Sequence, residues 1–424
     1  MKIAVIGSGG REHALAWKLS QSKHTDKLYA VPGNPGMVDI AECVAGVNIE
    51  DNDAIVKFAK DYAIDLVVVG PEVPLTNGVV DALAAEGIKA FGPSGKAAEL
   101  EGSKVYAKLV MKRYSIPTAR YEVFGDAARA RVYVRQMRQA FAIKADGLAA
   151  GKGVILTKNA DEAVAAIDTI MTDKAFGAAG SRVVIEEFMQ GEEASVLAFT
   201  DGKTIIPMVP SQDHKAVYDG DKGPNTGGMG TYAPAPVITP ELMDRVKKEI
   251  LEPMVEAMNK EGRPYKGCLY AGLMITDKGP KVVEFNARFG DPETQVVLPL
   301  LKSDLVEVML ACIDGKLAET PIEWFNGAAV CVVMASGGYP GSYEKGKEIT
   351  GLEAAKADGD IVFHAGTKLA NGKIVTNGGR VLGVVGQAEN IKAAVDKAYE
   401  GVAKISFEKE YHRNDIAHRA LERL

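Results

Sequence analysis

The sequence has little of what marks several classes of protein. Its four cysteines, Cys43, Cys268, Cys312 and Cys331, are widely spaced and form no C-x-x-C pair, so neither a disulfide framework nor a zinc site is indicated. The longest apolar run, 328–335, is too short to cross a bilayer, and no signal-peptide pattern precedes the first strand-like segment. We therefore expect reduced cysteines, no association with a membrane and a cytoplasmic protein.

An excess of positive charge is also missing. The formal net charge is −6, so no general attraction to nucleic acid is expected, and any phosphorylated ligand must be held by local groups. The 424 residues, 47% of them hydrophobic, exceed what one core normally supports. We expect a globular protein of two to four domains, with nothing that demands more than a monomer.

The first hundred residues alternate short strands with helices, which predicts a parallel, doubly wound sheet. Each strand ends in a glycine- or proline-bearing loop, and ligands of such sheets lie outside the carboxyl ends of the strands. A compact polar ligand is therefore expected at this edge. The predicted strands are Lys2–Gly7, Lys27–Val31, Asp65–Gly70 and Lys89–Gly92, and the helices are His13–Gln21, Asp51–Tyr62 and Asn77–Glu86.

The first of these loops resembles a dinucleotide fingerprint but departs from it. Glu12 stands where G-x-G-x-x-G requires its third glycine, and no acidic residue is convincingly placed after the second strand. The start of a helix and a guanidinium still suit a single phosphate. We therefore predict a phosphate site at Gly9, Gly10 and Arg11 rather than an NAD site.

The rest of the chain divides into a linker and three further parts. A helix is expected over Ser103–Ser115, and a small α/β unit contains strands at Phe141–Ala145, Gly153–Thr157 and Arg182–Glu187 and a helix at Asp161–Thr172. A last region opens with a strand near Ala328–Met334 and ends with a helix near Asn390–Ala403. The predicted domains are 1–102, a linker 103–120, a small subdomain 121–191, a large subdomain 192–326 and a C-terminal domain 327–424.

A glycine-rich loop follows Lys144 and joins two strands of the small unit. The loop, Gly147 to Gly153, can fold over phosphates and offer them backbone N–H groups, while Lys144 supplies a fixed cation. It is not a Walker A loop, because Gly153 stands where Ser or Thr is required. An ordinary hairpin is the alternative, and the combination of glycine and lysine favours phosphate contact.

Two other polar segments suggest ligand contacts. The strand that ends at Glu186 and Glu187 runs through Phe188 and Met189, whose apolar side chains and exposed backbone suit an adenine ring, and a carboxylate after the next glycine suits a ribose. The segment 212–230 reads as a long polar loop without regular structure, which is more often functional than decorative. In it we predict a substrate site at Asp213, Lys215, Asn225, Thr226 and Gly227, and we do not predict His214 as a catalytic base.

The segment 281–295 carries the strongest chemical pattern. Read as a strand to Arg288, it places Glu284, Asn286 and Arg288 on one face. A carboxylate and an amide oxygen suit Mg²⁺, which takes its other ligands from phosphates and water, and a guanidinium suits an anion. A half-buried strand with a solvated face is the alternative, but the turn chemistry of 290–293 favours a metal–phosphate site.

Together these segments resemble the ATP-grasp ligases, and the resemblance covers essentially the whole chain. Each motif alone is weak, whereas the ordered set with its spacings is very specific. The motifs are Gly7-Ser-Gly-Gly-Arg-Glu-His-Ala, Gly102-Ser-Lys104, Lys144-Ala-Asp-Gly-Leu-Ala-Ala-Gly-Lys-Gly, Gln212-Asp-His-Lys, Gly223-Pro-Asn-Thr-Gly-Gly-Met-Gly, Glu284-Phe-Asn-Ala-Arg-Phe-Gly-Asp-Pro-Glu-Thr-Gln and Ser336-Gly-Gly-Tyr-Pro-Gly.

The resemblance implies a multidomain α/β fold with ATP bound between the two subdomains. Lys104 and Lys144 would contact its phosphates, Glu186 to Met189 its adenine and Glu193 its ribose. Glu284 and Asn286 would hold Mg²⁺ or Mn²⁺. Many members carry a third carboxylate on the preceding strand, where this chain has Tyr270-Ala271-Gly272.

The implied reaction joins glycine to 5-phosphoribosylamine in purine synthesis, through glycyl phosphate and with release of ADP. Lys144 and Arg288 would stabilise the transferring charge, and the N-terminal glycine loops would hold the phosphoribosyl group. The alternatives are another carboxylate–amine ligase, a nicotinamide dehydrogenase and a non-catalytic nucleotide-binding regulator. Glu12 argues against the dehydrogenase.

Overall fold

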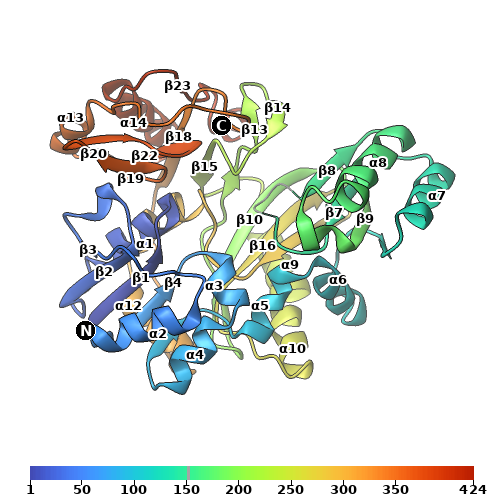
Figure 1. The fold of residues 1–424 in the computed structure, drawn as a ribbon, viewed down its shortest axis with the longest axis horizontal. Coiled ribbons are helices and arrows are strands. Elements are labelled where there is room, and N and C mark those ends of the chain that lie inside the picture. The colour runs from blue at the N-terminus through green and yellow to red at the C-terminus, as the bar shows by residue number, and fades with distance from the viewer. Residues whose placement is uncertain (150–152) are drawn as a thin grey trace.

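The computed structural model describes residues 1–149 and 153–424. The N-terminal domain, the large subdomain and the C-terminal domain meet in the middle of the molecule, and the small subdomain projects to one side (Figure 1). Within the described residues, no helix is both long and apolar enough to cross a membrane.

The N-terminal domain is built on a parallel sheet in the order β3-β2-β1-β4-β5. Its central strands are continuous apolar runs because helices cover both faces of such a sheet. The strands are β1 Lys2–Gly7, β2 Lys27–Pro32, β3 Glu42–Cys43, β4 Leu66–Val69 and β5 Lys89–Phe91, and the helices are α1 Gly10–Leu19, α2 Asn52–Asp61, α3 Glu72–Thr76, α4 Val79–Ala85 and α5 Gly95–Gly102.

The chain order reverses between β1 and β4, where a doubly wound sheet normally binds its ligand. The Glu12 side chain fills this point and is 2% exposed. A Cβ at Gly7 would lie 2.5 Å from the Glu12 Cγ, and a Cβ at Gly70 would overlap the Glu12 carboxylate. The two strand ends therefore need glycine to accommodate Glu12, and the space that a dinucleotide would use is occupied.

Helix α6 (Lys104–Arg113) leads from the N-terminal domain into the small subdomain. The small subdomain is an antiparallel sheet in the order β6-β9-β7-β8 with two helices on it. Asp126 and Asn159 cap these helices by accepting bonds from the backbone N–H groups of Arg129 and Glu162. Its elements are β6 Tyr121–Phe124, α7 Ala127–Met137, β7 Phe141–Ala145, β8 Val154–Thr157, α8 Ala160–Ile167 and β9 Val183–Glu187.

The large subdomain has an antiparallel sheet in the order β11-β10-β16-β17. Helix α11 packs on α1, and α12 shares a hydrophobic core with β1, so this segment is joined tightly to the N-terminal domain. The elements are β10 Glu192–Thr200, β11 Ile205–Pro207, α9 Pro240–Val246, α10 Glu252–Lys260, β16 Gly267–Thr276, β17 Gly279–Asn286, α11 Thr294–Leu300 and α12 Leu305–Asp314.

The C-terminal domain is not confined to the C-terminal part of the chain. Its sheet has the order β12-β15-β18-β22-β19, and β12 and β15 come from within the predicted large subdomain. The segment read as a loop without regular structure is therefore four short strands, and that prediction was wrong. The elements are β12 Gln212–Asp213, β13 Ala216–Tyr218, β14 Lys222–Asn225, β15 Gly230–Ala233, β18 Ala328–Ser336, α13 Leu352–Ala357, β19 Ile361–His364, β20 Thr367–Ala370, β21 Lys373–Thr376, β22 Arg380–Ala388, α14 Ile391–Lys404, β23 Glu410–Tyr411 and α15 His418–Leu421.

Arg413 ties the C-terminal segment to the β13–β14 hairpin. Its side chain is fully buried, and its guanidinium donates to Asp415 at 2.7 Å, to Asp221 at 3.1 Å and to the Ala216 carbonyl at 3.1 Å. Since both carboxylates are partly exposed, this cluster is an anchor between two segments rather than a sealed ion pair.

We predict that Arg413→Met lowers the free energy of unfolding by roughly 2–3 kcal/mol, less than breaking a fully buried pair because its partners are partly exposed. Urea denaturation followed by circular dichroism measures this. The control, Lys373→Met, removes an exposed pair with Glu348 and should leave the denaturation midpoint unchanged. Equal midpoints for both variants would contradict the anchoring role of Arg413.

Candidate active site

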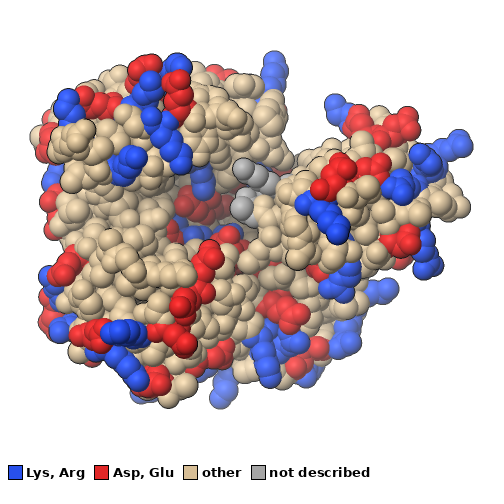
Figure 2. All heavy atoms as spheres, in the orientation of Figure 1, with Lys and Arg blue, Asp and Glu red and all other residues tan. Residues whose placement is uncertain are grey.

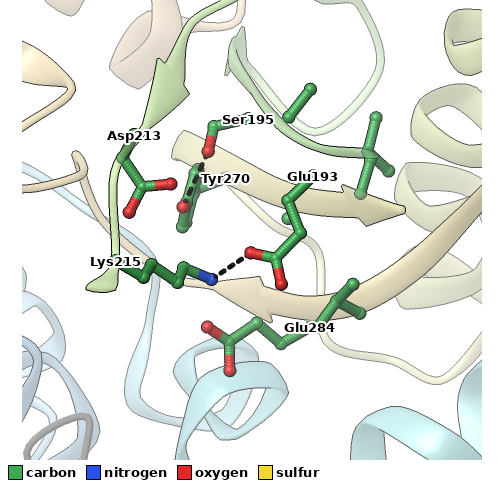
Figure 3. A pocket seen from close by; sticks show the side chains of 10 residues that line it. Glu193, Ser195, Asp213, Lys215, Tyr270 and Glu284 are labelled. Carbon is green, nitrogen blue, oxygen red and sulfur yellow. Dashed lines mark hydrogen bonds and ion pairs between the residues drawn. The ribbon is translucent and has the colours of Figure 1, made fainter. Parts of the chain in front are cut away.

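A small pocket lies in the central hollow, where the sheet of the large subdomain faces the N-terminal and C-terminal domains. Figure 2 shows this hollow, with acidic and basic side chains on its floor. Charged groups from separate parts of the chain point into the pocket (Figure 3). Its lining residues are Glu193, Ala194, Ser195, Asp213, Lys215, Tyr270, Gly272, Leu273, Val283 and Glu284.

Two predicted phosphate contacts, Lys104 and Lys144, come to one side of this pocket. Lys144 is the second-to-last residue of β7, is 3% exposed and donates to the Val283 carbonyl at 2.9 Å. Lys104 opens α6 and donates to the Gly147 carbonyl at 3.3 Å. Burial lowers the pKa of Lys104, while Glu284 opposes this effect. The predicted loop from Gly147 to Gly153 includes residues 150–152, which lie outside the described residues.

Asp146, just before that loop, joins it to α6. Its Oδ1 accepts bonds from the Ser103 hydroxyl and the Val105 N–H, each at 2.9 Å, and its carbonyl accepts from the Lys104 N–H at 2.9 Å. Arg182 donates to its other carboxylate oxygen at 2.9 Å. Asp146 was not predicted as a functional residue, yet it sets the position of the helix that carries Lys104.

Lys144 also belongs to a buried charge cluster that the sequence analysis missed. The Oε1 of Glu186 lies 2.9 Å from the Lys144 Nζ and 3.1 Å from the Lys108 Nζ, and both Glu186 and Lys108 are almost fully buried. Burial lowers the pKa of Lys108 to about 8, against the attraction of Glu186. Lys108 lies one helical turn after Lys104, and this spacing is the signal that could have revealed it.

The predicted adenine segment crosses between the two subdomains. Phe188 and Met189 lie between β9 and β10, and the Phe188 side chain is 44% exposed. Glu187 is held by Arg120 at 2.8 Å, and Glu193, the predicted ribose contact, begins the next strand beside Glu192. Four of the five predicted adenine and ribose residues therefore have accessible side chains, whereas Glu186 points into the buried cluster.

The predicted metal strand has a bulge. Gly272 pairs with Glu284 and Leu273 with Val282, so Val283 is the extra residue, and Val283 and Glu284 both line the pocket. The expected alternation is therefore broken. The strand ends at Asn286, so the prediction that it extends to Arg288 was wrong.

Glu284 lies in a strongly positive environment. Burial raises the pKa of Glu284, but the cations Lys215, Lys144, Lys104 and Arg288 outweigh burial and hold this pKa below its ordinary value. A Cβ built on the opposite residue, Gly272, would lie 3.4 Å from the Glu284 carbonyl oxygen and 3.5 Å from the Glu284 Cγ. Glycine at this position thus places no side chain against Glu284.

Arg288 is held by two carboxylates of the N-terminal domain. Its guanidinium lies 3.0 Å from the Glu101 Oε1 and 3.3 Å from the Glu72 Oε2. Burial lowers the pKa of Arg288, but Glu101 and Glu72 more than compensate and raise it above its ordinary value. Glu101 precedes the Gly102-Ser103-Lys104 motif, and its Oε2 accepts from the Ala287 N–H at 2.6 Å. Neither acid was predicted as a site residue.

The opposite side of the pocket carries Asp213, Lys215 and Glu193. The Lys215 Nζ lies 2.7 Å from the Glu193 Oε2, and Figure 3 shows this pair between Asp213 and Glu284. Burial raises the pKa of Asp213 to about 7; Lys215 opposes the rise, whereas Glu293 and Glu193 add to it. His214 points away, because its Nε2 accepts from the Ala417 N–H at 3.0 Å.

The other predicted substrate residues form a bridge to the C-terminal domain. The Thr226 hydroxyl donates to the Lys215 carbonyl at 2.8 Å, the Gly227 N–H donates to the Tyr339 hydroxyl at 3.0 Å, and Asn225 is exposed. Arg380 donates to the Gly227 carbonyl at 2.8 Å and to the Asp291 carbonyl at 3.1 Å. Tyr339 and Arg380 were not predicted as site residues.

The predicted phosphate loop is held by carboxylates in this structure. The Gly9 N–H donates to Glu12 at 2.7 Å and the Arg11 N–H to Asp291 at 3.2 Å. The Arg11 guanidinium donates to Glu12 at 2.6 Å, and a Cβ at Gly10 would lie 2.7 Å from the Gln295 Nε2. A phosphate at the start of α1 would have to replace these contacts.

Three sequence families match consecutive parts of this architecture. Residues 1–101 match the phosphoribosylglycinamide synthetase N domain, residues 102–294 its ATP-grasp (A) domain and residues 329–419 its C domain. The chain belongs to the phosphoribosylglycinamide synthetase family. Its resemblance to the ATP-grasp ligases and the predicted multidomain α/β class are thereby confirmed. Membership of the family also argues against the dehydrogenase alternative.

Individual relatives are similar in sequence to this chain over nearly its whole length. The phosphoribosylamine–glycine ligase of Halalkalibacterium halodurans is 53% identical over 99% of this chain and 97% of that protein. The human and chicken trifunctional purine biosynthetic proteins adenosine-3 are 51% and 53% identical over 99% of this chain, which spans only 42% of their length.

Solved structures give the same architecture. The phosphoribosylamine–glycine ligase of Thermotoga maritima has a TM-score of 0.86 at 36% identity and covers 98% of this chain and 100% of that one. The biotin carboxylase domain of Hydrogenobacter thermophilus 2-oxoglutarate carboxylase, in complex with magnesium ADP, has a TM-score of 0.74 at 19% identity, covering 97% and 91%. The second likeness shows the fold alone.

The raised pKa of Asp213 predicts a pH-dependent stability. Between its ordinary pKa of 3.8 and about 7, the folded protein holds a proton that the unfolded chain has released, so this residue's contribution to the free energy of unfolding falls as pH rises. Because Asp213→Asn has no carboxylate that titrates at this position, the free energy of unfolding of the variant should not fall with pH in this way. The melting temperature of the variant minus that of the native protein should rise by a few degrees from pH 5 to pH 8 in thermal denaturation. A difference that does not vary with pH would contradict the shift.

Proposed function

We propose that this protein joins glycine to 5-phosphoribosylamine with ATP, forming phosphoribosylglycinamide, ADP and phosphate. The observation that carries the proposal is Glu284, a pocket carboxylate surrounded by Lys215, Lys144, Lys104 and Arg288. Such a concentration of cations suits transferring phosphoryl oxygens, and the name of the 53% identical relative from Halalkalibacterium halodurans, phosphoribosylamine–glycine ligase, gives the substrates. We further propose that it works as a monomer in the cytoplasm.

The proposed nucleotide site uses both subdomains. Lys104 and Lys144 would hold the phosphates, while the hinge from Glu186 to Met189 would hold the adenine and Glu193 the ribose. Support comes from the pairing of β7 with β9, from the start of β10 just after β9 in the chain and from the accessible Phe188 between β9 and β10. To contact a ribose, Glu193 would exchange its present partner Lys215 for hydroxyl groups.

A divalent cation, Mg²⁺ or Mn²⁺, fits the donors on β17. Glu284 supplies a carboxylate that its neighbours keep ionised, Asn286 supplies an amide oxygen, and Gly272 places no side chain against Glu284. When bound, this ion would neutralise charge on the phosphates. With only two protein ligands proposed, the remaining coordination falls to phosphate and water oxygens.

The proposed chemistry needs no nucleophile from the protein. A carboxylate is a poor electrophile, so the glycine carboxylate first takes the γ-phosphoryl group of ATP. The amine then displaces phosphate from glycyl phosphate. The protein contributes alignment and positive charge: Lys144 faces the phosphates, and Arg288 and Lys215 face the glycine carboxylate. Glu72 and Glu101 would keep Arg288 in place for this role.

The proposed amine site lies on the other side of Lys215, towards the N-terminal and C-terminal domains. Asp213, Asn225, Thr226 and Gly227 border it. The Gly9, Gly10 and Arg11 loop would hold the phosphate. This loop is linked to the rest by Asp291, which accepts from the Arg11 N–H and lies 3.4 Å from the Arg380 guanidinium.

Isotopic labelling tests the proposed sequence of bonds. If a glycine carboxylate oxygen becomes the bridge of glycyl phosphate, that oxygen leaves with the phosphate. Glycine labelled with ¹⁸O in its carboxylate should pass one label per turnover into inorganic phosphate and none into the nucleotide, as measured by mass spectrometry. Label in AMP would indicate attack at the α-phosphorus and end this mechanism.

ATP binding without amine-dependent release of ADP would instead indicate a regulator.

The metal site is tested by substitution. Glu284→Ala should abolish turnover, here a loss of more than about 10³-fold, because it removes a charged ligand at the transferring group. Asn286→Ala should be milder and recover partly at high Mg²⁺. Steady-state kinetics measures both, and circular dichroism should show an intact fold, as for the exposed control Glu249→Ala. Near-normal activity of Glu284→Ala would remove β17 from the metal site.

A further inference from the structure

Acyl transfer to an amine leaves a proton that must go to a base. Amines form amides only as neutral nucleophiles, so the attacking nitrogen becomes positively charged as the C–N bond forms, and it must then lose one proton. We propose that Asp213 is the group that accepts this proton. The inference rests on the proposed function and assigns a specific chemical role to one residue on the amine side of the pocket.

Asp213 has the position that this role requires. It belongs to β12, the edge strand of the C-terminal sheet, and its side chain lines the pocket beside Lys215 (Figure 3). It is 8% exposed, so a substrate in the pocket can reach it while bulk water largely cannot. Among the described residues, the only donor set against its carboxylate is its own backbone N–H, so the carboxylate keeps acceptor capacity for a ligand.

The other carboxylates of the pocket already have partners. Glu193 is paired with Lys215 at 2.7 Å. Glu284 faces four cations that lower its pKa, which makes it a weak base, and it lies on the side of the pocket assigned to the phosphates. Asp213 and Glu284 lie on opposite sides of the Lys215 side chain in Figure 3, so the pocket separates a phosphate side from a proton-accepting side.

Three further groups near the pocket are unsuited. Glu293 is 3% exposed, does not line the pocket and accepts a bond from the Tyr270 hydroxyl at 2.9 Å. Burial raises the pKa of Tyr270 well above its ordinary value, so it holds its own proton at neutral pH. His214 is directed towards Ala417 and Asp221, away from the pocket.

The surroundings of Asp213 suit an acceptor that works near neutral pH. Burial, Glu293 and Glu193 raise its pKa to about 7 against the pull of Lys215. A base is most effective when its pKa is close to the working pH, because it is then both unprotonated often enough and strong enough. An ordinary aspartate, with a pKa near 3.8, would be a much weaker base.

In the proposed step, the nitrogen lone pair of the amine attacks the carbonyl carbon of glycyl phosphate, and the C–N bond forms. One N–H proton passes to the Asp213 carboxylate. The bond from carbon to the bridging oxygen breaks, and phosphate leaves with the electron pair. Asp213 then releases its proton to water when the products leave the pocket and water enters it.

Hydrogen bonds from Thr226 fix the segment just after Asp213. The Thr226 N–H and hydroxyl both donate to the Lys215 carbonyl, at 2.7 and 2.8 Å, and thus hold the chain that leaves β12. The same segment continues to Gly227, which is held by Arg380 and Tyr339. The base is therefore positioned from the C-terminal domain, on the side where the amine would enter.

Single-turnover experiments with native protein and Asp213→Asn test this assignment. All three substrates are mixed with excess enzyme, and ADP and amide are measured separately after rapid quenching. Because Asp213 acts only after glycine is phosphorylated, the variant should form ADP within about threefold of the native rate, while amide formation falls by about 10²–10⁴-fold, the usual contribution of a positioned base. The matched control Asp277→Asn, at an exposed turn, should change neither rate.

The alternative outcomes are distinct. If ADP and amide formation fall together, Asp213 acts in glycine binding or phosphorylation and the inference is overturned. If both stay at native rates, Asp213 has no role in the reaction, which also overturns it. Unfolding of the variant is detected by circular dichroism, and Asp213→Glu, which retains a carboxylate, should then restore part of the amide formation. Failure of native protein to form any amide would instead overturn the proposed function.

Discussion

The grouping of positive charge around Glu284 is the constraint on which the rest of the site depends. Its four cations come from the start of α6, the end of β7, the segment after β12 and the turn after β17. Like charges at such short range repel one another, so they can be kept together only around a carboxylate and with further acids behind them. Each of these further acids is paired with one of the four cations. They are Glu186, Glu193, Glu72 and Glu101.

Two kinds of contact join the four parts of the chain. Charged contacts join them around Glu284, and apolar contacts join them farther from it. One large hydrophobic core links the N-terminal sheet to α12 and the C-terminal sheet. The small subdomain has a separate core of its own. Polar contacts to the others include those of Asp146 with Ser103, of Lys144 with the Val283 carbonyl and of Glu187 with Lys281.

Much of the fold could be predicted from local patterns. The predicted strands 2–7 and 141–145 coincide with β1 and β7, since continuous apolar runs bounded by glycine or polar residues identify buried strands well. The helices α5 and α7 and the strand β6 were not predicted, because their apolar residues are few or interrupted by charge. The strands between residues 212 and 233 were missed because each has only two to four residues, and β15 also pairs with β18, far along the chain.

The motifs in the sequence identified several residues of the candidate site, but they did not show which side chains form ion pairs with one another. Lys144, Glu284 and Lys215 stand in conspicuous motifs and do meet in or beside one pocket. Glu101 and Arg380 could not be ranked above ordinary surface charges from the sequence, because only the folded chain shows what they face. The alternation used for 281–288 failed for a related reason: a bulge is a property of two strands, and one strand read alone does not reveal it.

The exchange of strands between the large subdomain and the C-terminal sheet has a consequence for how this protein can be divided. A chain cut at residue 326 would retain β15 but lose β18, its main partner. The N–H and C=O groups of β15 that now face β18 would become an open edge, and Tyr232 of this strand, which is fully buried in the intact protein, would lose its β18 neighbours. Open edges with apolar neighbours pair with other chains, so such a fragment should aggregate. The C-terminal sheet and the pocket lined by Asp213 of β12 therefore depend on the same set of paired strands.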